Sequence, residues 1–264
     1  MIHADAFDRY REGNSLLHLL DPRVKVAITV LYILSNAVLP DGAWAAFGIA
    51  WGLLLLGNAI SGLGAGFTLR QSFIALPFAL IALSTLFSVP GAPVAALQIG
   101  SLSLVITGAG LLRFTSILAR SWLSVQMAIL LVATTQFPDL MHALRHLRLP
   151  DVLVSVISFM YRYLFVLVDE AMRLLRGREA RLARLPGKRS GGSIGWRARV
   201  AGNLAGQLFL RSLERADRVY QAMMARGFQG QLLTLNPHQM SQTDWIAGGL
   251  AMAALLAIQV TGRL

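Results

Sequence analysis

Residues 44–59 read Trp44-Ala-Ala-Phe-Gly-Ile-Ala-Trp-Gly-Leu-Leu-Leu-Leu-Gly-Asn-Ala59 and contain no charged side chain. They belong to a longer uncharged run, residues 42–69, and a second uncharged run covers residues 71–112. A helix needs about 20 mostly apolar residues to cross the hydrocarbon core of a bilayer. Both runs exceed that length, which soluble cores do not do, so the sequence predicts an integral membrane protein.

The composition of the whole chain agrees with this prediction. Of its 264 residues, 55% are hydrophobic and 14% are charged, whereas an ordinary soluble domain has about 25% charged residues. The absence of cysteine excludes disulfide scaffolds, thiol nucleophiles and cysteine-ligated metal centres. The formal net charge of +11 would indicate nucleic-acid binding in a soluble protein. In a membrane protein such an excess marks the cytoplasmic loops instead.

Five membrane-spanning helices are expected. The first begins at Pro22, because Asp21 can cap the free backbone N–H groups and a proline at the first helical position needs no N–H of its own. Thr107 is a similar N-cap for the fourth helix, and residues 97–106 before it are expected to form an external loop or short strand. The five spans are predicted at residues 22–39, 44–59, 71–87, 108–135 and 245–260.

The distribution of charge predicts the topology. Residues 138–241 contain 16 of the 24 Lys and Arg but seven of the 13 Asp and Glu, a net charge of +9. The positive-inside rule places this block in the cytoplasm, together with the basic N-terminus. An even number of spans must then precede the block, which agrees with four spans before it and one after it.

Residues 152–168 are apolar enough to suggest a further span, but Arg162 interrupts them and the charged residues 169–184 follow. If they crossed the membrane, the most basic segment of the chain would lie outside, against the same rule. They are therefore interpreted as the buried first part of a long cytoplasmic helix that lies against the membrane domain.

The predicted fold is an all-α integral membrane protein with about five transmembrane helices and a cytoplasmic helical domain. Residues 1–137 form the N-terminal segment and the first four spans, residues 138–241 the cytoplasmic domain, and residues 242–264 the last span. A Pro- and Gly-containing loop at residues 185–192 separates two long helices in the cytoplasmic domain.

The second long helix, residues 196–226, is amphipathic and has a clear end. Gly227 suits a left-handed C-cap, and Arg226 complements the negative end of the helix dipole. An ordinary helix terminus explains this pattern on physical grounds alone. Its apolar or small residues recur at helical spacing at Val200, Leu204, Leu208, Ser212, Ala216, Val219 and Met223.

Three segments resemble a known family of membrane proteins. They are Asn14-Ser-Leu-Leu-His-Leu-Leu-Asp-Pro-Arg-Val-Lys25, Thr134-Thr-Gln-Phe-Pro-Asp-Leu140 and Ser212-Leu-Glu-Arg-Ala-Asp-Arg-Val-Tyr-Gln-Ala-Met-Met-Ala-Arg-Gly-Phe228. In order and spacing they resemble the transmembrane T component of energy-coupling-factor (ECF) transporters, in particular the cobalt-type CbiQ family. The resemblance extends from Asn14 to Trp245.

This resemblance implies a scaffold in the inner (plasma) membrane that is not itself an enzyme and needs no cofactor. The scaffold would join two copies of a cytoplasmic ATP-binding-cassette (ABC) ATPase to a membrane S component that binds Co²⁺ or Ni²⁺, with room for a small accessory membrane subunit. Its helical cytoplasmic domain would be the coupling domain, and the lipid bilayer its solvent.

The resemblance also implies two Ala-Arg-Gly-like motifs at the ends of the coupling helices, each placing an arginine in a groove of one ATPase. The second motif matches fully at Ala225-Arg226-Gly227. The first falls at Ala180-Arg181, where Leu182 replaces the usual small residue, and Arg184 is an alternative anchor. A guanidinium suits this role because its fixed fork makes several charge-assisted hydrogen bonds.

Other candidate sites have less support. His142 and His146, four residues apart, could offer two imidazoles to one metal, but a third and fourth ligand are absent, so no metal site is predicted. Ionisable groups at membrane depth need a partner or water, which singles out Arg113, Arg120 and Arg162. For Arg113 the outer interface is expected, and for Arg120 backbone carbonyls or a partner subunit.

Two other functions compete with the scaffold. A permease subunit of a conventional ABC importer would itself line the substrate path. A membrane-embedded lipid-modifying enzyme would need clustered acids, whereas the 13 acids here are scattered. No GxxxxGK[ST] phosphate loop or Ser-His-Asp arrangement occurs, so no catalytic residue is predicted. The basic block lacks the interleaved aromatic residues of a single-strand binder, so no nucleic-acid partner is predicted.

Overall fold

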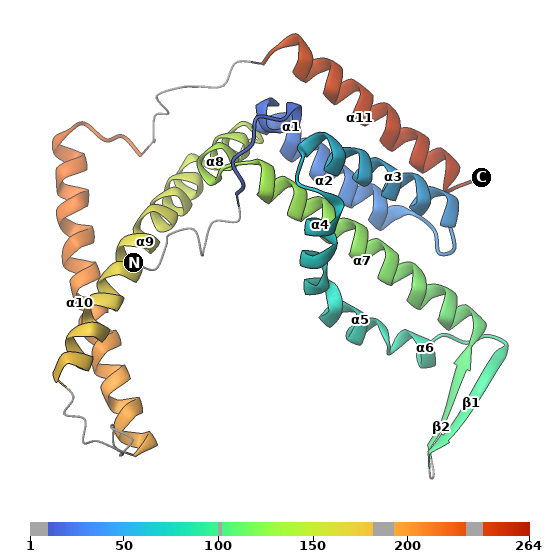
Figure 1. The fold of residues 1–264 in the computed structure, drawn as a ribbon, viewed down its shortest axis with the longest axis horizontal. Helices are drawn as coiled ribbons and strands as arrows, with labels where there is room; N and C mark the ends of the chain where they lie inside the picture. The colour runs from blue at the N-terminus through green and yellow to red at the C-terminus, as the bar shows by residue number, and fades with distance from the viewer. Residues whose placement is uncertain (1–9, 100–101, 182–192, 231–239) are drawn as a thin grey trace. The chain divides into compact units, whose positions relative to one another are not determined.

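The computed structural model describes residues 10–99, 102–181, 193–230 and 240–264, whose regular elements are helices and one two-stranded sheet (Figure 1). The chain divides into two compact units. We call residues 1–147 with 236–264 the membrane unit, and residues 148–235 the two-helix unit. The predicted all-α class is confirmed, while the predicted membrane topology and its domain boundaries stay predictions.

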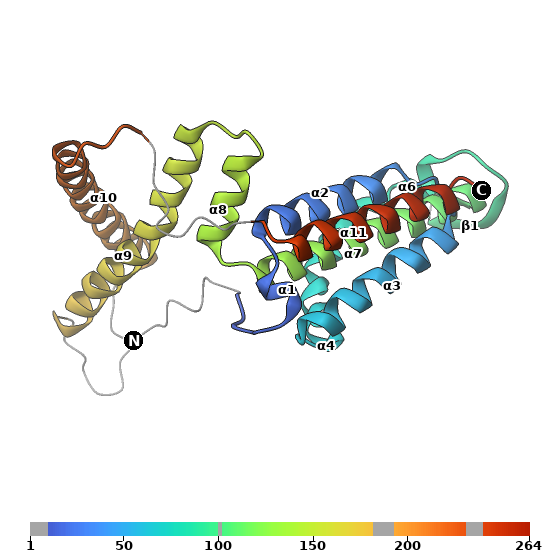
Figure 2. The same cartoon turned by 90° about the horizontal axis from the view of Figure 1, so that it is seen from above.

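Four long helices form the body of the membrane unit, where α2, α3, α7 and α11 run lengthwise beside one another (Figure 2). In particular, α2 contacts α7 and α11, and α3 contacts the same two helices. The elements of this unit are α1 (Leu16–Leu19), α2 (Pro22–Val38), α3 (Trp44–Ser61), α4 (Ala65–Gln71), a 3₁₀ turn (Ser72–Ala75), α5 (Leu76–Ala82), α6 (Thr85–Ser88), β1 (Pro93–Ile99), β2 (Leu102–Thr107), α7 (Gly108–Thr134), α8 (Phe137–His146) and α11 (Gln242–Thr261).

Both predicted N-caps are confirmed. The Asp21 carboxylate accepts a 2.8 Å hydrogen bond from the backbone N–H of Arg23, and Pro22 is the first residue of α2. The Thr107 hydroxyl oxygen accepts a 3.1 Å bond from the Gly110 N–H at the start of α7. Such caps are local, since they need only the residues within one turn.

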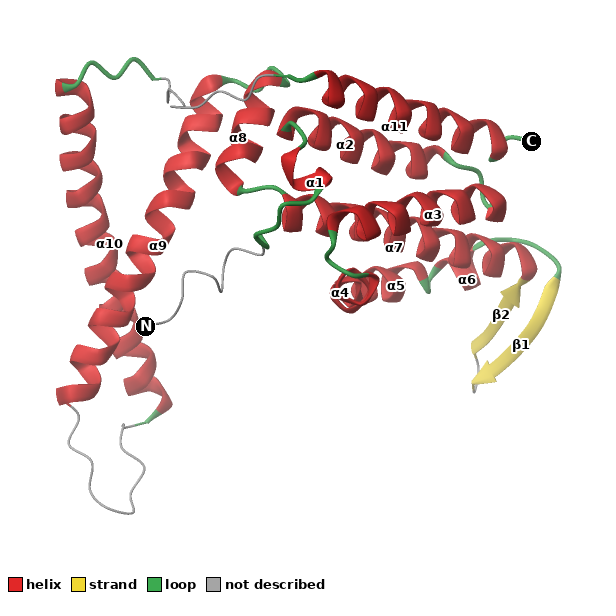
Figure 3. Ribbon diagram, turned by 45° about the horizontal axis from the view of Figure 1, so that its top comes forward, coloured by secondary structure: helices red, strands yellow, loops and turns green. Residues whose placement is uncertain are grey.

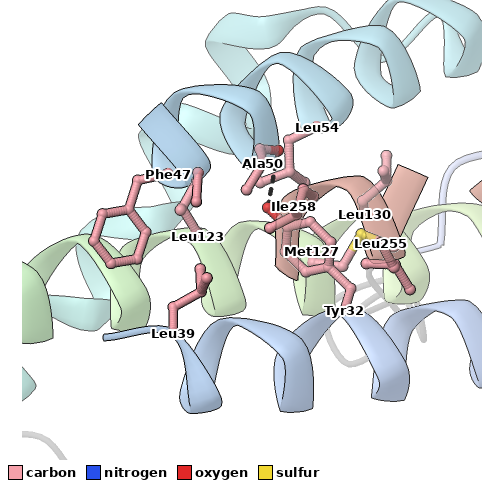
Figure 4. Close-up of a cluster of buried hydrophobic side chains, with 11 residues drawn as sticks. Tyr32, Leu39, Phe47, Ala50, Leu54, Leu123, Met127, Leu130, Leu255 and Ile258 are labelled. Atoms are coloured by element: carbon pink, nitrogen blue, oxygen red, sulfur yellow. Dashed lines mark hydrogen bonds between the residues drawn. The ribbon is translucent and has the colours of Figure 1, made fainter. Parts of the chain in front are cut away.

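The core of the membrane unit lies where the four long helices meet (Figure 4). Tyr32 is fully buried at its centre, and its hydroxyl donates a 3.0 Å hydrogen bond to the backbone carbonyl of Ala50. This bond satisfies a polar group that would be costly in hydrocarbon, and it joins α2 to α3. The other buried members are Leu39, Ala46, Phe47, Ala50, Leu54, Leu123, Met127, Leu130, Leu255 and Ile258.

A polar junction fixes the start of α11 although a long segment separates this helix from the rest of its unit. Asp244 accepts a 2.8 Å hydrogen bond from the Asp21 N–H, and it completes a capping box with Ser241. Lys25 of α2 donates a 3.3 Å bond to the carbonyl of Thr134 at the end of α7. One end each of α2, α7 and α11 is therefore held together by named polar contacts.

The third predicted span, a single helix over residues 71–87, is wrong in form. The structure has helical pieces interrupted at residues 72–75 and 83–84, and the segments 66–75 and 80–88 are bent by 49°. Pro77 cannot donate a helical hydrogen bond, which favours a break before it. The hydroxyls of Ser72 and Thr85 bond to the carbonyls of Leu69 and Ala82, so side chains satisfy backbone groups near the interruptions.

Residues before α7 form a hairpin. Strands β1 and β2 pair antiparallel, with Leu97 opposite Leu104. The expectation of a short strand within residues 97–106 is confirmed, but the sequence argument did not predict its partner strand.

The two-helix unit consists of α9 (Asp151–Arg181) and α10 (Ile194–Ala225), whose lengths of 31 and 32 residues agree with the two long helices predicted. The packing of the first part of α9 against the membrane domain stays a prediction, and within its own unit this part is largely exposed. Val152 is 67% exposed and Met160 61% exposed, because α9 meets α10 over a short stretch and no other described element of its unit covers it. The predicted loop at residues 185–192 lies outside the described residues.

Length and hydropathy select four helices as candidate spans, with the bent pair as a fifth, and the chain is a multi-pass membrane protein. Helix α2 falls short of this selection because it has 17 residues, one fewer than the 18 required. Helix α9 passes because its first half is apolar. Its cytoplasmic placement rests on the charge distribution and stays a prediction. The selected helices are α3, α7, α9 and α11.

Candidate coupling site

The C-terminal end of α10 is a well-formed Schellman turn. Gly227 has a φ of +80°, in the left-handed region that favours glycine. The N–H of Phe228 donates to the Met223 carbonyl and that of Gly227 to the Met224 carbonyl, both at 3.0 Å. These are the two bonds that define the motif. The predicted left-handed C-cap at Gly227 is confirmed.

This turn leaves Arg226 available to a partner. Ala225, Arg226 and Gly227 are all exposed. The Arg226 guanidinium makes no hydrogen bond or ion pair with any residue in the described part of the chain. A fixed backbone thus presents a cation that has no counter-charge among the described residues.

The first motif lies at the last described turn of α9. Ala180 and Arg181 are exposed, and Arg181 also makes no ion pair with a described residue. Leu182 and the alternative anchor Arg184 lie outside the described residues. Helices α9 and α10 run in opposite directions and cross (Figure 3), so the end of α9 and the end of α10 lie at opposite ends of the two-helix unit.

Glu170 joins the two helices near their crossing. It is 7% exposed, and its carboxylate accepts a short hydrogen bond from the Arg211 guanidinium of α10. Arg173, one turn further along α9, approaches the other carboxylate oxygen at 3.4 Å. The hydrogen bond from Arg211, aided by the positive charge of Arg173, holds the pKa of Glu170 below its ordinary value, although burial opposes this shift. Glu170 is therefore a stable anion at neutral pH.

A second contact holds the turn after α10 against the first half of α9. The rings of Phe159 and Phe228 meet edge to face with centroids 6.2 Å apart. The Ser155 hydroxyl donates a 3.0 Å hydrogen bond to the carbonyl of Gly230. The backbone around Arg226 is thus anchored to α9 as well as to its own helix.

Two adjoining grooves lie between α9 and α10. The first has a volume of about 560 Å³, and both Arg162 and Arg226 line it. The second, of about 470 Å³, is more apolar and includes Met160 and Leu213. Sequence reasoning noted Arg162 only as an arginine within an apolar stretch. It missed the approach to Arg226, because that depends on where the helices cross. The grooves share Phe159, Tyr163, Val219, Met223 and Phe228.

The remaining candidate arginines and histidines lie in the membrane unit, apart from Arg162. Arg120 donates a 2.6 Å hydrogen bond to the Leu39 carbonyl and pairs with Asp41 at 2.7 Å, so its expected bond to a backbone carbonyl is confirmed. Arg113 is exposed. The rings of His142 and His146 lie 4.8 Å apart, and the described residues contain no group of three or more metal-ligating side chains.

Comparisons with known proteins agree with this architecture. The chain is 30% identical to the energy-coupling factor transporter transmembrane protein EcfT of Lacticaseibacillus paracasei, over 95% of this chain and 96% of the relative. It is 26% identical to EcfT of Thermosediminibacter oceani, over 95% and 94%. It is also 28% identical to the cobalt transport protein CbiQ of Rhodobacter capsulatus, over 66% of each chain.

A family model provides the remaining comparison, and it covers most of the chain. The model described as cobalt transport protein CbiQ matches residues 13–237, which include α9, α10 and the Arg226 turn. The chain belongs to the CbiQ family of cobalt transport proteins.

Proposed function

We propose that this chain is the transmembrane scaffold of an ECF-type importer for cobalt or nickel ions. It would couple ATP hydrolysis by two cytoplasmic ABC ATPase subunits to movement of a membrane S component that binds the ion. The observation that carries this proposal is the match to relatives named as ECF transmembrane proteins over nearly the full length of both chains. The CbiQ description supports the choice of metal ion.

The two-helix unit supplies the coupling in this proposal. Arg226 on its Schellman turn and Arg181 at the end of α9 each bind one ATPase subunit, since each guanidinium is exposed and has no described counter-charge. The Glu170–Arg211 pair links the helices between these two contact points. Closure of the ATPases would then rotate one helix against the other, and rigid helices transmit such motion.

The proposed location follows from the charge distribution. The two-helix unit and the N-terminus face the cytoplasm, where ATP is available, and the hairpin faces the outside of the plasma membrane. The chain's role as a transport component favours a non-enzymatic function. A scaffold needs an S component to bind the substrate, whereas a permease that lines its own substrate path does not. Dependence of uptake on an S component therefore distinguishes the two.

The test is reconstitution of the tagged chain with the ATPase and S-component proteins encoded beside it. We expect Arg181→Ala and Arg226→Ala each to reduce ATPase capture by about 30-fold, the loss typical of an interface arginine worth about 2 kcal/mol. Uptake of radioactive Co²⁺ or Ni²⁺ should decrease in parallel. Arg218→Ala, an exposed arginine of α10 that lines neither groove, is the control. Full capture and uptake in both motif variants would contradict the proposal.

A further inference from the structure

The larger groove of the two-helix unit brings together two arginines that are distant in the sequence. Arg162 projects from α9 and Arg226 from the end of α10, and both line the same hollow of about 560 Å³. Both residues are exposed, and neither guanidinium makes an ion pair or hydrogen bond with a residue that the structure covers. Two cations that line one groove make its electrostatic potential positive, which attracts an anion.

The other walls of the groove are mostly apolar and already in place. The edge-to-face contact of Phe159 with Phe228 and the backbone bond from Phe228 to Met223 fix one side. Tyr163 stands one turn beyond Phe159, with ring centroids 6.4 Å apart. A partner entering a groove that the chain forms by itself pays little ordering entropy.

We infer that this groove receives a segment of the cytoplasmic ATPase in which a carboxylate side chain stands beside a large apolar one. Arg162 then binds the carboxylate together with Arg226, while the apolar side chain lies against Phe159, Tyr163 and Met223. Guanidinium forks match a carboxylate in geometry as well as charge. The volume lies within the range of about 300–1,000 Å³ found for specific binding pockets. The inference rests on the proposed function and adds Arg162 to its interface.

The ATPase is the favoured occupant because of where Arg226 stands. Arg226 belongs both to the groove and to the exposed turn that is proposed to contact the ATPase. A segment that enters beside Arg226 therefore extends the same interface. An anionic lipid headgroup shares the negative charge, but it offers no reason for the groove to adjoin the Schellman turn.

The first experiment measures ATPase affinity for the full chain in nanodiscs. We expect Arg162→Gln and Arg226→Gln each to raise the dissociation constant about tenfold or more. Because both arginines bind one carboxylate, the double variant should lose less than the product of the two single losses. Arg162→Lys, which keeps the charge and loses the fork, should give an intermediate value. Arg218→Gln should bind as the unchanged chain does.

Different outcomes would overturn the proposed function and the role of the groove. If Arg181→Ala and Arg226→Gln both retain full affinity, the proposed function is wrong. If both weaken binding while Arg162→Gln binds normally, the proposed function stands and the inference about the groove is wrong. If the double variant loses ATPase affinity by the full product of the two single losses, the two arginines do not share one carboxylate.

A second measurement identifies the occupant directly and leaves both arginines in place. A photoreactive phenylalanine analogue replaces Tyr163, which lines the groove. In the assembled transporter, the expected crosslink joins position 163 to an ATPase peptide that contains Asp or Glu next to a large apolar residue. Crosslinks to the S component or to lipid, without any to the ATPase, would overturn the inference.

Discussion

At the scale of single residues, Glu170 has the most consequential environment in the two-helix unit. It is buried, it is ionised, and it receives both Arg211 from the other helix and Arg173 from its own. The described residues of α10 include none that is buried, so apolar packing alone holds the two helices weakly. The attachment of α10 to α9 therefore depends on this carboxylate more than on any other described polar group.

Replacement of Glu170 by glutamine should loosen α10. The glutamine side chain lacks the charge that binds Arg211 and Arg173, although it keeps nearly the same shape. We expect faster backbone amide exchange in residues 205–225, measured by hydrogen–deuterium exchange of the purified chain. Glu179→Gln, at an exposed glutamate on the same helix, should leave this exchange unchanged. Unaltered exchange in the Glu170→Gln variant would contradict the assigned role.

The same contact predicts a dependence on pH. The pKa of Glu170 is lowered in the folded chain by the Arg211 hydrogen bond, so its contribution to stability is fully present above the unfolded value of about 4.3. It is lost only as the pH falls through the lower folded value. Amide exchange of α10, corrected for intrinsic rates, should be constant from pH 8 to 5 and increase below pH 4. An increase between pH 7 and 5 would point to a different group.

For Arg162, the sequence predicts an unusual position but not the neighbours of the side chain in the fold. Its position within an apolar stretch is enough to mark it as unusual in the sequence. Its place in the groove with Arg226 depends on the crossing of two long helices and on the return of Phe228 to α9. No local pattern encodes such a crossing, so the partnership was not predictable from the chain alone.

At the scale of elements, the Schellman turn at the end of α10 is proposed to present Arg226 to the ATPase. Gly227→Ala should weaken it, because a Cβ at a φ of +80° costs about 1–2 kcal/mol. We expect lower ATPase capture with the side chain of Arg226 intact. Gly227→Asn should capture more than Gly227→Ala, since asparagine tolerates this conformation better. Equal ATPase capture by the Gly227→Ala variant and the unchanged chain would show that capture does not need this turn geometry.

A close approach between α6 and α7 gives a further prediction at this scale. A Cβ added at Gly110 would lie 2.8 Å from the Leu86 carbonyl oxygen, which is closer than real Cβ contacts allow. Gly110→Ala should destabilise the membrane unit by about 1–3 kcal/mol, seen as a lower midpoint of thermal unfolding in detergent. Gly48→Ala is a matched control in α3, because no atom lies within 4 Å of its added Cβ. A midpoint as high as that of the control would contradict the contact.

Elements whose ends depend on neighbouring residues were predicted well. Elements whose shape depends on packing against distant parts of the chain were not. Asp21, Pro22 and Thr107 fixed the starts of α2 and α7 because a cap needs only its own turn. The third span was predicted as one straight helix. Its apolar composition does not distinguish a straight helix from a bent pair of helices. Pro77 signals a break, but the 49° bend depends on the packing of its pieces.

At the scale of the whole molecule, the placement of residues 138–241 in the cytoplasm is the main prediction to test. The native chain has no cysteine, so a single introduced cysteine can be labelled without background. In spheroplasts, a membrane-impermeant maleimide should label Val94→Cys in strand β1 of the hairpin and leave Gln221→Cys of α10 unlabelled until the membrane is permeabilised. Both positions are exposed. Labelling of Gln221→Cys from outside would reverse the topology.

The crossing of α9 and α10 has a mechanical consequence that follows from helix geometry. Arg226 comes fifteen positions after Arg211, and Arg181 comes eleven positions after Glu170. At a rise of about 1.5 Å per residue, the two arms are about 22 Å and about 16 Å long. If each helix turns by about 10° about the Glu170–Arg211 contact, Arg226 moves by about 4 Å and Arg181 by about 3 Å. Two motors with equal strokes at these tips would thus rotate the two helices by unequal angles.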